Sequence, residues 1–318
     1  MQIPALALAA AALSAALLPT GPATPAASLA APPAAPSAAV APTAADQAAV
    51  RAYWTPRRMR EAVEESGGPL FEGTPDGRPW RGDPGAVRGI GRLFMVLPDD
   101  RKATCTAAVV SAPSKDVVAT AGHCVHLKAV GGFMKALMFV PGFEDGRAPY
   151  GQYPATAVGI APEWAAREDH GADYAFLGLA GDERGRHVQD VVGGRPAAFG
   201  PVPGPKTALG YPFAPPYDGR TLQFCAGATT AVADPRMPGG EQLRPCRMTN
   251  GASGGPWYAQ TASGATVQAG VTSSRPGTAD YADAAWGAMF DGRARRLYDY
   301  VAKTPTVKAK KSPISTGQ

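Results

Sequence analysis

A histidine, an aspartate and a serine stand in this order along the chain, each in a distinctive local sequence. His123 lies in "TAGHC", Asp173 opens "DYAFL", and Ser253 stands among glycines in "GASGGP". A serine hydroxyl becomes a nucleophile when a base removes its proton. An imidazole acts as that base when a carboxylate fixes its tautomer and stabilises the imidazolium. The three residues therefore have the types that acyl transfer requires.

The glycines around Ser253 favour a chemical role over a plain flexible loop. An oxyanion that develops during acyl transfer needs preset backbone N–H donors. Gly251 suits this role, because a residue without Cβ can turn its N–H inward without a clash. Gly254 and Gly255 allow a substrate chain to approach closely. Each feature is weak alone, whereas the order His, Asp, Ser with these flanking residues is specific.

Other residues of the same types compete for these roles. His126, His170 and His187 lie in polar or loop-like surroundings, which indicates surface positions. Asp169 precedes Asp173 closely, but its context "EDHG" indicates a solvated side chain. An acid at the head of an apolar run, such as Asp173, is compatible with a turn or cap role as well as with a buried carboxylate behind an imidazole.

Short apolar runs separated by Gly, Pro and Asp must position these residues. Many such runs, rich in Val, Phe and small residues, are typical of all-β barrels and sandwiches. The runs are Ile90–Leu97, Thr104–Ala112, Asp116–Ala121, Ala136–Phe143, Tyr153–Ala161, Asp173–Ala180, Lys206–Pro212, Thr221–Ala233, Gly255–Gln260 and Thr266–Ser274. One short helix is expected after Pro56 and another at Ala294–Lys303, whereas residues 31 to about 50 are expected to be extended.

Composition favours a packed globular chain, since 45% of the 318 residues are hydrophobic and 18% are charged. The net charge of +5 depends on the last sixteen residues, which hold four lysines and no acid, so that the rest of the chain carries +1. A short basic tail is usually solvated and disordered. Nucleic-acid binding by the body of the protein is therefore not expected.

The N-terminal region predicts export. Ala5 to Leu18 is apolar apart from Ser14, is too short to span a bilayer, and is followed by small residues, as in a secretory signal. "SLA" at Ser28–Ala30 is one of several candidate cleavage points. The first 50 residues hold no Lys or Arg, so the alternative is a low-complexity Ala/Pro tail. No membrane span is expected.

Four cysteines fit an exported chain. Cys105, Cys124, Cys225 and Cys246 form an even set that suggests disulfides and allows three connectivities. Two pairs, each about twenty residues apart, would each close a local loop worth roughly 3 kcal/mol in the entropy model. None of them has the C-x-x-C spacing of zinc or redox sites. No metal or organic cofactor is expected.

Three segments of the chain resemble the catalytic segments of chymotrypsin-fold serine proteases: "TAGHC", "DYAFL" and "GASGGP". The longer stretches "CTAAVVSAPSKDVVATAGHCV" and "CRMTNGASGGPW" are more similar still to secreted trypsin-like proteases of actinobacteria. The resemblance covers about Gly89 to Tyr300. It implies an all-β fold of two six-stranded antiparallel barrels with a short C-terminal helix, and an active site between the barrels.

The resemblance also assigns roles to single residues. It implies that His123 is the general base, that Asp173 orients it and that Ser253 is the nucleophile. The amides of Gly251 and Ser253 would form the oxyanion hole. The implied disulfides are Cys105–Cys124 and Cys225–Cys246.

The chain departs from this family in the residue before the serine and in the specificity pocket. Ala252 stands where animal members carry an Asp that pairs with a freed N-terminus, so that ion pair cannot form. Arg247 stands where trypsin-like members have the acid that selects Lys or Arg, so these side chains should be disfavoured, and acidic or small polar ones preferred. Alternatively, Arg247 faces solvent. The other pocket residues implied by the family are Asn250, Thr272, Ser273 and Ser274.

These features predict a secreted, monomeric serine endopeptidase that acts on proteins or peptides. The alternatives are a catalytically weak protease-like binding module and an esterase that uses the same triad. The expected organisation is a signal peptide at 1–30, an Ala/Pro-rich linker or pro-segment at 31–85, barrels at 86–200 and 201–302, and a basic disordered tail at 303–318.

Overall fold

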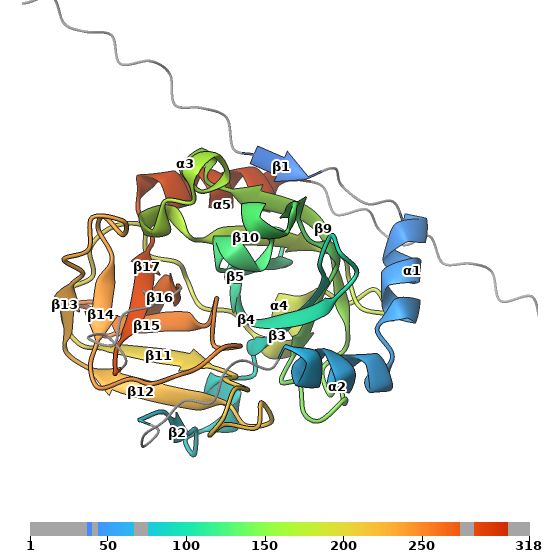
Figure 1. Cartoon of the computed structure of the whole chain (residues 1–318), viewed down its shortest axis with the longest axis horizontal. Coiled ribbons are helices and arrows are strands. Elements are labelled where there is room, and N and C mark those ends of the chain that lie inside the picture. Colours follow the sequence, from blue (N-terminus) through green and yellow to red (C-terminus); the bar gives the residue numbers. More distant parts are fainter. Residues whose placement is uncertain (1–36, 40–43, 67–75, 274–282, 305–318) are drawn as a thin grey trace, which may run out of the picture. The chain divides into compact units, whose positions relative to one another are not determined.

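Two large antiparallel sheets hold most of the strands in the computed structural model (Figure 1). The structure describes residues 37–39, 44–66, 76–273 and 283–304. The expected signal peptide and nearly all of the expected basic tail lie outside these residues. No helix in the described ranges is long and apolar enough to cross a membrane.

The first sheet closes into a six-stranded barrel in the order β9-β10-β5-β4-β3-β8, because β8 pairs back with β9. An additional strand, β1, pairs with β9 at Val158–Ile160, beyond the residues of β9 that pair with β8. The strands are β1 (Ser37–Ala39), β3 (Ile90–Val96), β4 (Lys102–Val110), β5 (Val117–Thr120), β8 (Lys135–Pro141), β9 (Tyr153–Ile160) and β10 (Ala175–Leu179). Every residue of β3, β5, β9 and β10 is buried, so both faces of these strands are covered.

The second sheet follows the order β13-β14-β17-β16-β15-β11-β12-β2 and stays open in the described part of the chain, as a half-barrel. Its strands are β2 (Arg78–Pro79), β11 (Lys206–Gly210), β12 (Gln223–Gly227), β13 (Thr229–Ala231), β14 (Glu241–Leu243), β15 (Pro256–Gln260), β16 (Thr266–Thr272) and β17 (Ala285–Met289). A disulfide from Cys225 in β12 to Cys246, just after β14, links the two sides of this opening.

The other elements after residue 83 are short, apart from the C-terminal helix. They are β6 (His126–Leu127), β7 (Gly132–Phe133), α3 (Pro162–Arg167), α4 (Val188–Val192), α5 (Gly292–Lys303) and the 3-10 turns η1 (Pro84–Ala86), η2 (Gly122–Cys124), η3 (Lys128–Val130) and η4 (His170–Ala172). Helix α5 begins where the Asp291 carboxylate accepts from the amides of Arg293 and Ala294. Its buried Leu297 and Val301 join the core of the first barrel.

Two helices occupy part of the segment that the sequence assigns to a linker or pro-segment: α1 (Ala44–Tyr53) and α2 (Pro56–Glu65). The expectation of extended chain up to about residue 50 is therefore wrong for α1. Helix α2 begins where expected, because Pro56 occupies its first turn and the Thr55 hydroxyl accepts from the amide of Arg58.

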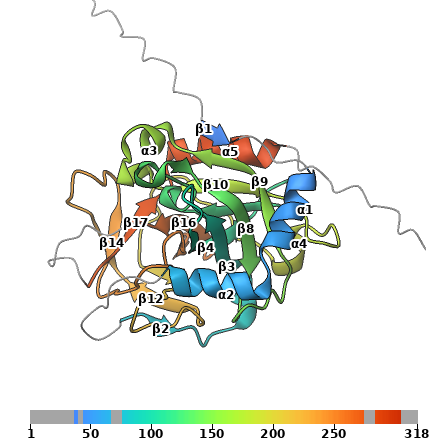
Figure 2. The same ribbon diagram turned by 45° about the vertical axis from the view of Figure 1, so that its right-hand side comes forward.

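Both helices pack against the outside of the first barrel, beside β3 and β8 (Figure 2). Trp54 and Met59 are fully buried there with Phe94 and Met138. The Trp54 indole N–H donates to the carbonyl of Ala136 at 2.6 Å. Burial of such large apolar side chains stabilises the folded state by roughly 1.5–3 kcal/mol each.

Candidate active site

Strands β5 and β10 bring the histidine and the aspartate to one end of the first barrel. The two strands pair antiparallel, with Thr120 opposite Ala175. His123 lies in η2, which follows β5, and Asp173 directly follows η4, which precedes β10. Two side chains that are fifty residues apart in the sequence therefore meet.

Asp173 holds His123 by two contacts. Its Oδ1 accepts from the backbone N–H of His123 at 2.8 Å, and its Oδ2 lies 2.7 Å from the ring Nδ1. Since an ionised carboxylate only accepts hydrogen bonds, Nδ1 carries the proton and the neutral ring keeps a lone pair on Nε2. Gly122 permits this approach, because a Cβ there would lie 3.0 Å from Asp173 Oδ1.

Ser273 is a further partner of the same carboxylate. Its side chain is 3% exposed, and its hydroxyl donates to Asp173 Oδ2 at 2.6 Å. The sequence predicts Ser273 as a pocket residue, whereas the structure directs its hydroxyl to the aspartate. This role depends on a contact between residues one hundred positions apart, for which the sequence gives no local signal.

The electrostatics of this pair favour an ionised aspartate and a stabilised imidazolium. Burial tends to raise the pKa of the Asp173 carboxyl, but the charge and hydrogen bonds of His123 and the Ser273 hydroxyl outweigh it and lower that pKa. Burial tends to lower the pKa of His123, but the charge and hydrogen bond of Asp173 raise it above its ordinary value. The imidazole side chain keeps 19% of its surface exposed.

Ser253 lies in a turn that docks on the first barrel. Its carbonyl accepts from the amide of Thr106 in β4 at 2.8 Å. The next residue, Gly254, has φ +78°, and a Cβ there would lie 2.1 Å from Thr120 Oγ1. Thr120 ends β5, the strand that leads to His123. The serine turn therefore rests on the strands that present the histidine.

Two backbone amides in this turn remain available to a ligand. Those of Ala252, Gly254 and Gly255 each donate to a backbone carbonyl. Within the described ranges, the amides of Gly251 and Ser253 donate to no protein acceptor. A pair of preset donors beside a serine suits a developing oxyanion.

The first disulfide joins the histidine turn to the strand that holds the serine turn. Cys124 directly follows His123, and Cys105 directly precedes Thr106. Both sulfur atoms and the imidazole lie within 4.8 Å of one another. Because the sulfurs are bonded to each other, they are not the thiolates that a metal would need. The two disulfides in the structure are the pairs that the family resemblance implies.

Arg247, predicted at the base of the substrate pocket, is half-buried and has a partner from the N-terminal part of the chain. Its Nε lies 3.7 Å from Asp76 Oδ2. The adjoining Gly77 donates its amide to the hydroxyl of Tyr217 at 3.0 Å. The segment before β2 therefore places a carboxylate within ion-pair distance of Arg247.

The other predicted pocket residues fall in different places. Asn250 is exposed, and its carbonyl accepts from the amide of Phe213 at 2.8 Å. The buried Thr272 hydroxyl accepts from the indole N–H of Trp257 at 3.0 Å. Ser274 lies outside the described residues.

The remaining histidines are only partly where the sequence predicts them. His126 is 9% exposed and packs against Phe133 with ring centroids 4.8 Å apart, so its predicted surface position is wrong. His187 is partly exposed, and its Nδ1 lies 2.5 Å from Oδ2 of the buried Asp116. His170 is half-buried beside Trp164.

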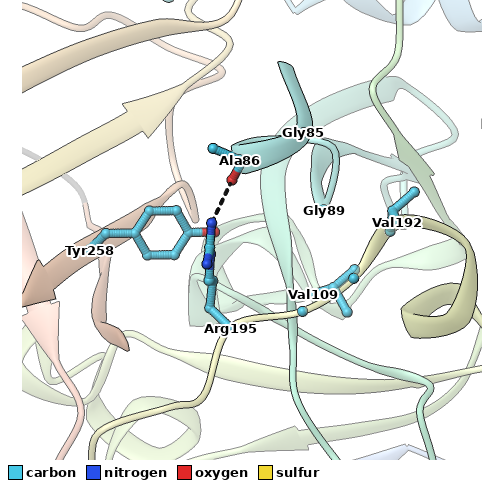
Figure 3. A pocket seen from close by; sticks show the side chains of 9 residues that line it. Gly85, Ala86, Gly89, Val109, Val192, Arg195 and Tyr258 are labelled. Atoms are coloured by element: carbon cyan, nitrogen blue, oxygen red, sulfur yellow. Dashed lines mark hydrogen bonds between the residues drawn. The ribbon is translucent and has the colours of Figure 1, made fainter. Parts of the chain in front are cut away.

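A cavity of about 160 Å³ lies apart from these groups (Figure 3). Arg195 and Tyr258 border it, and the Arg195 guanidinium donates to the carbonyl of Ala86 at 3.4 Å. His123, Asp173 and Ser253 do not line this cavity. It is therefore separate from the candidate active site.

Comparison with solved structures finds many similar chains. A protease, Anisep, from Arthrobacter nicotinovorans is 30% identical with a TM-score of 0.61, and the match covers 68% of this chain and 96% of that one. A thermostable serine protease, AL20, from an extremophilic microorganism is 33% identical with a TM-score of 0.61, and the match covers 70% and 100%. A Glu endopeptidase shares the fold. It is 16% identical with a TM-score of 0.54, and the match covers 72% of this chain and 98% of that one. No family model and no curated protein matches the sequence.

Proposed function

The chain belongs to the chymotrypsin-fold serine proteases, and from this membership we propose that it is an endopeptidase that works through an acyl-enzyme intermediate. One observation carries the proposal: Asp173 binds both the backbone and the ring of His123 beside the docked turn of Ser253. This arrangement supports a base with a fixed tautomer that acts on the serine, with two amides for the oxyanion.

In the proposed reaction, His123 Nε2 takes the proton of the Ser253 hydroxyl as Oγ attacks the scissile carbonyl carbon. The amides of Gly251 and Ser253 stabilise the oxyanion of the tetrahedral intermediate. When the C–N bond breaks, His123 gives its proton to the leaving amine, which departs from the acyl-enzyme. Water then attacks the ester with the same base, releasing the acid and restoring the serine. Asp173 stays ionised throughout and stabilises the imidazolium.

Export is part of the proposal. Residues 1–30 act as a signal peptide, and the two disulfides are consistent with an oxidising compartment. Residues 86–200 hold the closed barrel, residues 201–302 hold the half-barrel, and residues 303–318 are the basic tail. The active form is a monomer that cleaves proteins or peptides without a metal or organic cofactor.

A fluorophosphonate probe combined with a casein assay tests this function. The purified secreted protein should take one label, on Ser253, and should hydrolyse casein. The label requires an activated serine, and casein hydrolysis requires a cleft that accepts a polypeptide. A chain that takes no label would be a binding module. A chain that takes the label and hydrolyses esters but leaves casein intact would be an esterase.

Substrate preference provides a separate prediction. The position that holds an acid in trypsin-like enzymes is Arg247, so a buried Lys or Arg side chain would lack a counter-charge at a cost of several kcal/mol. In a mixed peptide library, cleavage after Lys or Arg should be at least about 100-fold slower than after small polar or acidic residues. A dominant cut after Lys or Arg would contradict this.

The Asp76→Asn variant refines the same experiment. Because Asp76 is the partner of Arg247, removing its charge should increase cleavage after Glu relative to cleavage after Ser. An unchanged ratio would show that Arg247 does not face the substrate. The variant preserves side-chain size and one acceptor oxygen, so the fold should not change.

A further inference from the structure

Arg92 in β3 is a buried cation, and the charge of Asp218 stabilises it from beyond ion-pair distance. Its side chain is 0% exposed, and no acid of the described ranges lies within ion-pair distance. Burial lowers its pKa to about 10. Its guanidinium lies 5.2 Å from the ring centroid of Tyr211 and 5.8 Å from that of Phe143. A buried charge is costly unless it makes specific contacts, so the contacts of Arg92 indicate its role.

The strongest of these contacts go to one loop, residues 211–219, called here the support loop. The Arg92 guanidinium donates to the carbonyl of Tyr211 at 3.2 Å and to that of Gly219. A third contact joins it to the Thr104 hydroxyl at 3.4 Å within the first barrel. Arg92 thus ties both ends of the support loop to the barrel.

The support loop in turn forms the wall behind Gly251. The Phe213 amide donates to the carbonyl of Asn250 at 2.8 Å. Gly251 has φ +92°, and a Cβ there would lie 2.3 Å from Phe213 Cδ1 and 2.5 Å from the Tyr211 carbonyl oxygen. The orientation of the Gly251 amide therefore depends on where this loop lies.

Helix α2 reaches the same loop from outside the barrel. Gly219 has φ +73°, and a Cβ there would lie 2.7 Å from Val63 Cγ1, 2.8 Å from Phe213 Cβ and 2.8 Å from the Arg92 guanidinium. Helix, guanidinium and loop therefore meet at one glycine. The buried Trp54 and its neighbours fix the helices on the barrel.

We propose that Arg92 is a positioning residue which, together with helix α2, holds the support loop against Gly251 and keeps the oxyanion amides preset. The inference rests on the proposed protease function. It gives residues 44–65 a place in the active enzyme, as a permanent intramolecular support rather than a pro-segment that is removed. Ala252, which is buried and uncharged, offers no ionic anchor for the turn, so the turn depends on its backbone hydrogen bonds, such as that of Thr106 with Ser253, and on packing of this kind.

The Arg92→Met variant tests the guanidinium, because methionine keeps much of the buried volume and removes the hydrogen bonds. We expect kcat to fall about 10- to 100-fold with KM within about threefold, since the displaced amide matters most in the transition state. The affinity for a peptide trifluoromethyl ketone, which forms an oxyanion on Ser253, should fall by the same factor. A purely structural role would lower the unfolding temperature without this separation of kcat from KM.

A pair of valines tests the helix and remains decisive if Arg92→Met does not fold. Val63→Ala removes the contact with Gly219, whereas Val50→Ala makes the same deletion in α1 on the same hydrophobic cluster. We expect Val63→Ala to lower kcat about 3- to 10-fold and Val50→Ala to leave it within twofold. Equal kcat values for the two variants, in enzymes with unchanged melting temperatures, would overturn the role of the helix.

Sequencing the N-terminus of the active secreted protein tests whether the helices are retained. We expect the chain to start before Ala44. A fully active form that starts after Glu65 would contradict the inference. The wild-type enzyme separates the two proposals: if it takes no fluorophosphonate label, the protease function itself fails. If it is labelled and Arg92→Met and Val63→Ala match its kinetics, only the support role fails.

Discussion

Replacing Ser253 with alanine is expected to lower kcat by roughly 10⁶ while leaving the fold intact, as when a catalytic unit of this type loses one member. The hydroxyl is the atom that bonds to the substrate, so no other group on the enzyme replaces it. The backbone of the turn should not change, because the Ser253 carbonyl that accepts from Thr106 is present in alanine as well. The measurements are kcat on a peptide substrate, fluorophosphonate labelling and circular dichroism.

Ser263→Ala is the matched control for this variant. Ser263 is an exposed serine between β15 and β16, with its hydroxyl 2.9 Å from that of Thr261. It should keep full activity and labelling. His123→Ala should cost about as much as Ser253→Ala, and the double variant little more, because the residues act as a unit. Near-normal turnover of Ser253→Ala would show that the nucleophile is assigned wrongly.

The sequence predicts the strands well, because most of them are apolar runs with clear ends. Each predicted run overlaps a strand of the structure, including the one that ends at Thr120 before the histidine. Three strands of the second sheet were not predicted. β2 (Arg78–Pro79) has two residues and lies in the segment assigned to a linker or pro-segment. β14 (Glu241–Leu243) has only three residues and two of them are polar, and β17 (Ala285–Met289), "AWGAM", has no β-branched residue.

The contacts that support the site could not be predicted, because they depend on tertiary structure. Arg92 interrupts an apolar run, which normally indicates the solvent face of a strand, yet both faces of β3 are covered. Helix α1 lies in an Ala-rich segment flanked by prolines, where local composition favours extended chain. Its position follows from the burial of Trp54 against the barrel, a contact that no local pattern encodes.

Replacing Asp173 with asparagine is expected to cause the second large loss of activity. In Asp173→Asn, the side-chain amide can donate a hydrogen bond to Nδ1 of His123, which moves the ring proton to Nε2. The imidazole is then unable to take a proton from Ser253, although the geometry is nearly the same. We expect kcat to fall about 10⁴-fold at neutral pH, with the fold retained.

The pH profile of the same variant tests the cause of the loss. In the wild-type enzyme Asp173 raises the pKa of His123 above its ordinary value of about 6.5. Because the protonated imidazole is inactive as a base, kcat/KM should fall as the pH drops through this raised pKa. In Asp173→Asn the charge is gone and burial still lowers the pKa, so the acid limb should move to lower pH. Asp169→Asn, the same change at a neighbouring acid that caps η4, should leave both rate and midpoint unchanged. Coincident acid limbs in the wild type and Asp173→Asn would mean that the carboxylate does not set the basicity of His123.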